Sequence, residues 1–188
     1  MEWILASASP RRKELLKQLI NTFEILPATG EEAAHGLTGA KLVEALATQK
    51  AQEVASRAEA KGKAVLGADT IVCLDGEVLG KPKDEADARR MLEALSGREH
   101  EVFTGVCISY PEQGLRKTLV ASDCTRVHFE TLSKAQIEAY IKTGSPMDKA
   151  GAYGIQDGGL VRSIDGSMSN VIGLPMELCK RMIDGAGI

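Results

Sequence analysis

Apolar and polar positions along the chain predict a protein that mixes strands and helices. Apolar runs typical of strands occur at residues 3–6, 23–26, 63–74, 102–110, 119–129 and 160–164. Amphipathic patterns predict helices at residues 10–20, 39–60, 85–95 and 134–141 and from residue 175 onward. The order lacks a strict β-α-β rhythm, and the long middle strands read as antiparallel. We therefore expect an α/β fold: a mixed twisted sheet flanked by helices, bent into two lobes around a cleft.

Local signals mark the ends of several of these elements. Ser9, Asp84 and Ser133 are good N-cap residues, and Ser133 also begins a capping box. The polar stretch at residues 111–117 predicts a hairpin loop, and the glycine-rich stretch at residues 144–159 is too punctuated for regular structure.

One acid interrupts the longest apolar strand segment. Asp69 stands among apolar neighbours, although Asp is a poor strand former and is costly to bury without a partner. The pair Asp75-Gly76 is a strong hairpin signal, so the return strand at residues 78–79 brings Lys81 back toward Asp69. This arrangement predicts a site for a phosphorylated ligand. The alternative is a hairpin with a satisfied acid and a surface lysine.

A second cluster of polar residues surrounds the expected start of the first helix. Ser7, Ser9, Arg11 and Arg12 lie there, and a helix N-terminus attracts anions through its free N–H groups and partial positive charge. Arginine can also grip phosphate oxygens with two hydrogen bonds. These residues predict phosphate binding, and the alternative is a well-capped surface helix with solvated arginines.

Further residues could complete such a site. Lys50 and Lys81 are candidate phosphate ligands. Glu32 and Asp69 could hold a divalent cation, because magnesium prefers one or two carboxylates together with phosphate oxygens and water. Asp69 could instead accept a proton from an attacking water.

A third block, residues 148–156, combines glycines with a terminal amide. The glycines allow backbone to approach a ligand closely, and Gln156 offers the donor and acceptors that recognition of a base requires. A glycine-rich turn with a surface amide is the alternative.

Composition narrows the class of protein. The chain has 188 residues, 44% hydrophobic and 26% charged, which is typical of a soluble globular protein. A net charge of −3 argues against nucleic acid as the main partner. The four cysteines form no C-x-x-C pair, and His35, His100 and His128 are isolated, so a zinc site is not expected. We find no signal peptide, membrane span, Walker A motif or dinucleotide fingerprint, and we expect a cytoplasmic protein.

Six stretches together carry a family resemblance: residues 5–12 (LASASPRR), 66–70 (LGADT), 79–82 (LGKP), 95–97 (LSG), 148–156 (DKAGAYGIQ) and 169–175 (SNVIGLP). In this order they resemble the Maf family of nucleoside triphosphate pyrophosphatases over essentially the whole length. The resemblance implies one Maf-like domain over residues 1–188, with the two-lobed fold of inosine triphosphatase-like enzymes. It also implies hydrolysis of a nucleoside triphosphate to the monophosphate and pyrophosphate. The resemblance further implies a divalent metal, magnesium or manganese, and a homodimer.

The resemblance also implies roles for individual residues. Asp69 falls at the position of the family's proton acceptor. The family's other polar site positions fall on Ser7, Arg12, Glu32, Lys50 and Lys81.

Three further residues, Arg11, Thr70 and Gln156, look like the branch of the family that acts on dTTP and UTP. A sister branch that acts on 7-methyl-GTP carries Trp in place of the first arginine, which suits stacking on a cationic purine. A glutamine amide, in contrast, can pair with the O4 and N3–H edge of thymine or uracil.

One departure from the family pattern is visible. Ser145 stands in the segment Gly144-Ser145-Pro146, where the family often has Glu. Two alternatives to dTTP and UTP hydrolysis are the same chemistry on another, modified nucleotide and a non-enzymatic regulator of septum formation that acts through a partner.

Overall fold

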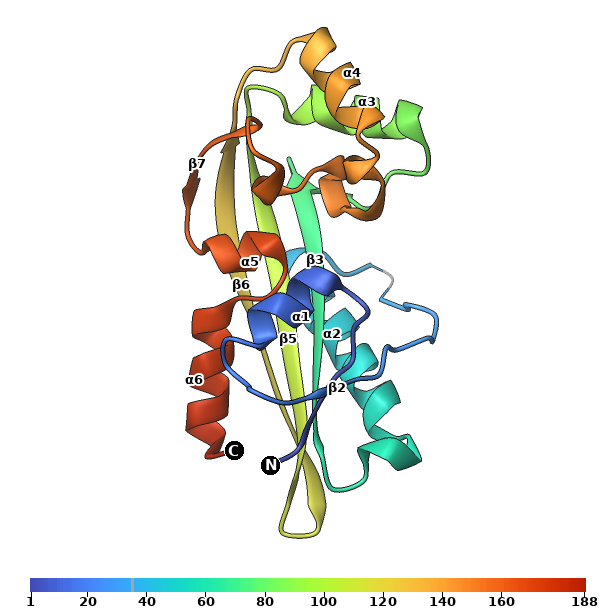
Figure 1. Cartoon of the computed structure of the whole chain (residues 1–188), viewed down its shortest axis with the longest axis vertical. Coiled ribbons are helices and arrows are strands. Elements are labelled where there is room, and N and C mark those ends of the chain that lie inside the picture. Colours follow the sequence, from blue (N-terminus) through green and yellow to red (C-terminus); the bar gives the residue numbers. More distant parts are fainter. Residues whose placement is uncertain (35) are drawn as a thin grey trace.

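The computed structural model contains a seven-stranded mixed sheet (Figure 1). It describes residues 1–34 and 36–188; His35 lies outside the described residues. The strands follow the order β2 (Glu24–Ile25), β1 (Trp3–Leu5), β3 (Ala64–Leu74), β5 (Glu99–Glu112), β6 (Leu115–Phe129) and β7 (Val161–Asp165), while β4 (Glu77–Leu79) also pairs with β3. β1 is parallel to β2 and β3, and the other pairs are antiparallel. The expected mixed sheet is confirmed.

Helices cover both faces of this sheet (Figure 1). They are α1 (Pro10–Leu16), α2 (Gly39–Ala55), α3 (Glu85–Leu95), α4 (Lys134–Lys142), α5 (Met168–Ile172) and α6 (Met176–Ala186), with short 3₁₀ turns at Ala58–Ala60, Ser145–Asp148, Ala150–Ala152 and Ile155–Asp157. α2 packs against β3 and β5 on one face. On the opposite face, α1 and α6 share one hydrophobic cluster, and α3 and α4 share another farther along the strands.

Side chains alternate between the two faces along β3. Val65 packs under α2, whereas Leu66 belongs to the cluster beneath α1 and α6. Continuing this period of two places Asp69 on the α2 face and Thr70 on the α1 face. Consecutive residues of one strand therefore serve opposite sides of the sheet.

Two glycines let α2 lie unusually close to the sheet. A Cβ atom on Gly67 would stand 2.6 Å from the Ala47 carbonyl oxygen, and one on Gly105 would stand 2.3 Å from the Val43 carbonyl oxygen. Any side chain at either position would push the helix away, because neither contact atom belongs to a flexible side chain. This close approach places residues 43–51 of α2 directly against β3 and β5.

The terminal signals of several elements are confirmed. Ser9 caps α1, Asp84 caps α3, and Ser133 forms the expected capping box at α4. Asp75 and Gly76 both have positive φ angles (52° and 84°), as a tight hairpin turn requires.

Other predicted boundaries are wrong. α2 ends at Ala55 rather than residue 60, because Arg57 adopts an extended backbone before a separate 3₁₀ turn. The expected loop at residues 111–117 is mostly strand, since β5 and β6 continue to a two-residue turn at residues 113–114. Pro111 is tolerated there because β3 pairs with β5 only as far as Ser109.

Two regions contain helical segments that the sequence pattern does not predict. α5 was missed, and residues 144–159 contain three short 3₁₀ turns where we expected irregular structure. None of the helices among the described residues is long and apolar enough to cross a membrane.

Candidate active site

The candidate active site is a cavity of about 780 Å³ at the edge of β3. β1 pairs with residues 64–66 of that strand, and β4 pairs with residues 72–74 on the same side. The intervening segment, residues 67–71, has no strand partner on that side among the described residues, so both of its faces open into one cavity. All of the predicted site residues line it: Ser7, Ser9, Arg11, Arg12, Glu32, Lys50, Asp69, Thr70, Lys81 and Gln156.

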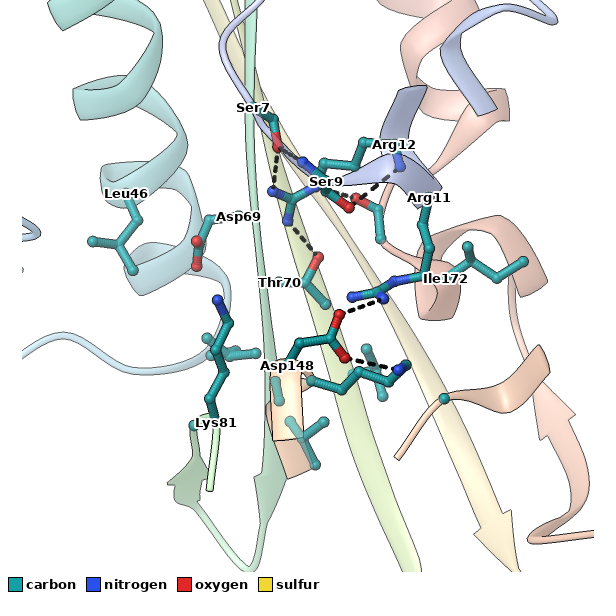
Figure 2. A pocket seen from close by; sticks show the side chains of 18 of the residues that line it. Ser7, Ser9, Arg11, Arg12, Leu46, Asp69, Thr70, Lys81, Asp148 and Ile172 are labelled. Atoms are coloured by element: carbon teal, nitrogen blue, oxygen red, sulfur yellow. Dashed lines mark hydrogen bonds and ion pairs between the residues drawn. The ribbon is translucent and has the colours of Figure 1, made fainter. Parts of the chain in front are cut away.

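Asp69 lines the cavity and is only 8% exposed. The ammonium group of Lys50, on α2, pairs with its carboxylate and also with Glu32 Oε1 at 2.8 Å. Lys81, which follows β4, points its side chain toward Asp69 (Figure 2). The hairpin and the close approach of α2 thus bring two lysines to one buried acid, as the sequence predicted for Lys81.

Glu32 and Asp69 provide the donors that a divalent cation would use. Both carboxylates contact the same Lys50 ammonium group, so they converge on one point that already holds positive charge. Among the described residues, no group of three His, Cys, Asp or Glu side chains could hold a metal without help. Two carboxylates fit magnesium or manganese if phosphate oxygens and water complete the coordination.

Arg12 is anchored from three directions, and Figure 2 shows two of the contacts, those with Ser7 and Thr70. Its Nε donates to the Gly173 carbonyl at 2.8 Å, and its terminal nitrogens donate to Thr70 Oγ1 at 3.1 Å and to Ser7 Oγ at 3.3 Å. Burial lowers the pKa of Arg12 below its ordinary value, and the nearby Asp69 carboxylate opposes that shift. A guanidinium remains charged despite such a shift, so this wall carries a fixed cation.

The serines beside Arg12 organise the start of α1. Ser9 Oγ accepts a hydrogen bond from the Arg12 backbone N–H at 3.4 Å, and Ser7 Oγ accepts one from the Ser9 N–H at 3.2 Å. Ser7 therefore accepts from both the turn and the guanidinium. This local arrangement follows from the Ser-Pro N-cap signal in the sequence.

The opposite end of the cavity is more exposed. Arg11 Nη1 lies 3.3 Å from Asp148 Oδ2, whose side chain is 63% exposed, and Lys149 Nζ contacts the other oxygen of Asp148 at 2.8 Å. Burial raises the pKa of Asp148, but its bonds to Lys149 and Arg11 outweigh that effect and lower the pKa below its ordinary value. Gln156 lies exposed in the neighbouring 3₁₀ turn.

Some residues of this site were not singled out from the sequence. Asp148 and Lys149 belong to the predicted block at residues 148–156, and their opposite charges inside a glycine-rich segment are the signal that marks them. The Gly173 carbonyl that holds Arg12 carries no side-chain signal at all. Ser145, the departure from the family pattern, donates to Asp157 Oδ2 at 2.7 Å and accepts from Lys149 Nζ at 3.0 Å, so it is integrated into this segment.

Comparison with known proteins identifies the family to which the chain belongs. The model of the family described as Maf-like protein matches residues 2–186. A dTTP/UTP pyrophosphatase of Symbiobacterium thermophilum is 50% identical over 98% of this chain and 93% of its own length. A protein with the same description from Thermococcus gammatolerans is 51% identical over 93% of this chain and 91% of its own length.

The fold also has a counterpart among solved structures. The Ham1 protein of Staphylococcus aureus superposes with a TM-score of 0.58, covering 99% of this chain and 100% of that one, at 17% sequence identity. At that identity, the likeness shows a shared fold. It confirms the expected α/β fold, a mixed sheet flanked by helices.

Proposed function

The chain belongs to the Maf family, and from this premise we propose that it hydrolyses dTTP and UTP to the monophosphate and pyrophosphate. Relatives described as dTTP/UTP pyrophosphatases are about half identical to it over nearly the whole chain. The observation that carries the proposal is the position of Asp69, a nearly buried acid that faces a large cavity lined by Arg12, Lys50 and Lys81. Such a cavity suits a polyanion that is cut beside a carboxylate.

In the proposed reaction, Asp69 is the general base. Its carboxylate accepts a proton from a water molecule as the water oxygen bonds to the α-phosphorus. The bond from that phosphorus to the bridging oxygen then breaks, and pyrophosphate leaves with the electron pair. Positioned bases contribute about 10²–10⁴-fold to such steps.

The surrounding cations would stabilise the charge that develops on the phosphoryl oxygens. Arg12 is held in place before substrate arrives, because Thr70, Ser7 and Gly173 fix its guanidinium. Preorganised donors of this kind cost no rearrangement when charge builds up. Lys50 and Lys81 approach from the other side of Asp69, and the Ser7–Ser9 turn adds neutral donors.

We propose that Glu32 and Asp69 hold a magnesium or manganese ion together with oxygens of the substrate. When bound, that ion would supply Lewis-acid stabilisation of the phosphoryl oxygens. Lys50, which contacts both carboxylates, keeps them close to each other. Chelation by EDTA is expected to abolish pyrophosphate release, and either metal should restore it.

The base would be read at the exposed end of the cavity. Gln156 can offer both a donor and an acceptor to O4 and N3–H of thymine or uracil. Arg11 lines the same end, held by Asp148. Thr70 contributes indirectly, because its hydroxyl oxygen already accepts from Arg12.

The proposal includes one Maf-like domain over residues 1–188, supported by the extent of the family match, and a homodimeric enzyme in the cytoplasm, where nucleotide substrates occur. Sedimentation of the purified protein tests the dimer.

The decisive experiment measures pyrophosphate release from dTTP, UTP, CTP and 7-methyl-GTP with metal present. We expect dTTP and UTP to be preferred. A preference for 7-methyl-GTP or another modified nucleotide would reassign the substrate. If all four nucleotides remain intact, the enzymatic proposal fails and a role through a partner gains support.

A further inference from the structure

A buried hydroxyl outside the cavity connects to its central arginine. Thr104, on β5, is fully buried and lies directly opposite Thr70 in the ladder between β3 and β5. Its Oγ1 is 2.9 Å from Thr70 Oγ1 and 2.9 Å from the backbone carbonyl oxygen of Asn170. It does not line the cavity, so any effect on the reaction must pass through another residue.

The chemistry of these groups fixes the direction of each hydrogen bond. A hydroxyl has one proton, and a carbonyl oxygen can only accept. Thr104 must therefore donate to the Asn170 carbonyl, which leaves its oxygen to accept from Thr70. Thr70 has then used its proton, and its oxygen accepts from Arg12, whose guanidinium can only donate (Figure 2).

Two routes of hydrogen bonds from the Arg12 guanidinium end on the same segment, residues 170–173. Arg12 Nη2 donates to Thr70, Thr70 donates to Thr104, and Thr104 donates to the Asn170 carbonyl at α5. Arg12 Nε donates to the Gly173 carbonyl, which lies just beyond the same helix. β3, β5 and the end of α5 are thereby fixed around one guanidinium.

We propose that Thr104 is a positioning residue for Arg12, acting through Thr70. The inference rests on the proposed function, because it assumes that Arg12 binds the phosphates of the substrate. Without the Thr104 hydroxyl, the Thr70 proton has no acceptor in the core and turns elsewhere. The Thr70 oxygen then no longer presents a fixed lone pair to Arg12, and the guanidinium loses one of its three anchors.

The test compares three variants of the full-length protein. Thr104→Val keeps the volume and removes the hydroxyl, whereas Thr104→Ser keeps the hydroxyl and removes a methyl group. Ser109→Ala is the matched control, because Ser109 is a buried hydroxyl on the same strand that accepts from Arg116 Nε at 2.8 Å, away from the cavity. For dTTP we expect kcat/KM to fall about tenfold in Thr104→Val, through both a higher KM and a lower kcat, and to change less than twofold in the other two variants.

A second readout does not depend on catalysis. Binding of inorganic triphosphate, measured by calorimetry, is expected to weaken about fivefold in Thr104→Val and less than twofold in Thr104→Ser. In an Arg12→Lys background, Thr104→Val should cost no further activity, because the group that it positions has already been changed. Should Thr104→Val fail to fold, Thr104→Ala is compared with Thr104→Ser, since both lose volume and only the serine keeps the hydroxyl.

The inference is overturned if Thr104→Val retains activity and triphosphate affinity within twofold of the wild type. It is also overturned if Thr104→Ser or Ser109→Ala loses as much as Thr104→Val, because the effect would then follow general packing. The proposed function fails separately, if the wild-type protein releases no pyrophosphate from dTTP or UTP. In that case triphosphate binding still decides whether Thr104 positions Arg12.

Discussion

The two ends of the cavity hold their arginines in different ways. Arg12, at the phosphate end, donates three hydrogen bonds to neutral partners from three separate segments, and one of these partners is backed by a fully buried hydroxyl. Arg11, at the base end, contacts Asp148 at 3.3 Å, and that carboxylate is 63% exposed and stands on a short 3₁₀ turn. The Arg12 guanidinium is fixed by hydrogen bonds to the sheet and its neighbouring segments, whereas the Arg11 guanidinium is held by an exposed carboxylate.

This difference matches what each end is proposed to do. Stabilising a phosphoryl transition state requires groups that are already in place when charge develops. Reading a base requires only a difference in affinity between similar ligands, which a few hydrogen bonds supply. Exposed ion pairs contribute about 0–1 kcal/mol, so the base end can change with little cost to the stability of the fold. Loss of activity should therefore be severe at the phosphate end and modest at the base end.

The largest expected effect is at Asp69. Replacing it in Asp69→Asn keeps the shape and removes the base, so we expect the turnover number for dTTP to fall about 100-fold or more. Steady-state pyrophosphate release measures this effect. Asp75→Asn, in the exposed hairpin turn of the same strand pair, is the control and should keep normal turnover. Near-normal turnover in Asp69→Asn would show that Asp69 is not the general base. It would also contradict the expected contrast between the two ends of the cavity.

The next prediction concerns how the stability of the protein depends on pH, through a histidine in the core beneath the base end. His100 is buried, its Nε2 lies 2.7 Å from Tyr153 OH, and Tyr153 lines the cavity. Burial, with a smaller contribution from His128, lowers the pKa of His100 to about 4. The unfolded chain, with a His pKa of about 6.5, binds more protons between these values, so the free energy of unfolding should fall by up to about 3 kcal/mol as pH drops from 6.5 to 4.

Urea unfolding across this pH range measures that slope. His100→Gln cannot titrate there, so its stability should depend less steeply on pH than that of the wild type. Equal slopes in the two proteins would show that His100 is protonated in the folded state as readily as in the unfolded one.

A smaller effect is expected at Gln156. Gln156→Leu removes the amide and keeps a side chain of similar size, so the preference for dTTP over CTP in kcat/KM should fall about tenfold, the value of one hydrogen bond. Gln52→Leu, an exposed substitution on α2 outside the cavity, is the control. If the ranking of bases is unchanged in Gln156→Leu, this end of the cavity does not read the base.

The smallest effect is expected at Asp148. Asp148→Asn removes the charge that holds Arg11, and because the pair is exposed we expect KM for dTTP to rise no more than about threefold. Asp165→Asn removes an equally exposed partner of Arg126 far from the cavity and should leave KM unchanged. A tenfold or greater rise in KM for Asp148→Asn would show that the exposed end matters to the reaction as much as the phosphate end does.

The parts of this molecule that local chemistry determines were predictable. The N-caps, the hairpin turn at Asp75 and the strand around Asp69 follow from neighbouring residues, and each is confirmed. The expected site residues gather in one cavity, although their roles remain predictions. What could not be predicted depends on the pairing of distant strands. Thr104 is linked to Arg12 through Thr70 only because the strand register places the two threonines opposite each other. α5 has five residues, which is too short for a periodic pattern.

Residues 67–71 of β3 pair with β5 on one side and with none of the described strands on the other, and they couple the site to the architecture of the sheet. Asp69 and Thr70 are neighbours in sequence, yet one serves the α2 side of the cavity and the other serves the α1 side. A slip of β3 by a single residue would exchange these sides at once and turn the acid toward the arginine. Such a slip would separate Asp69 from Lys50 and Thr70 from Arg12 together, so a form with this register is expected to be inactive.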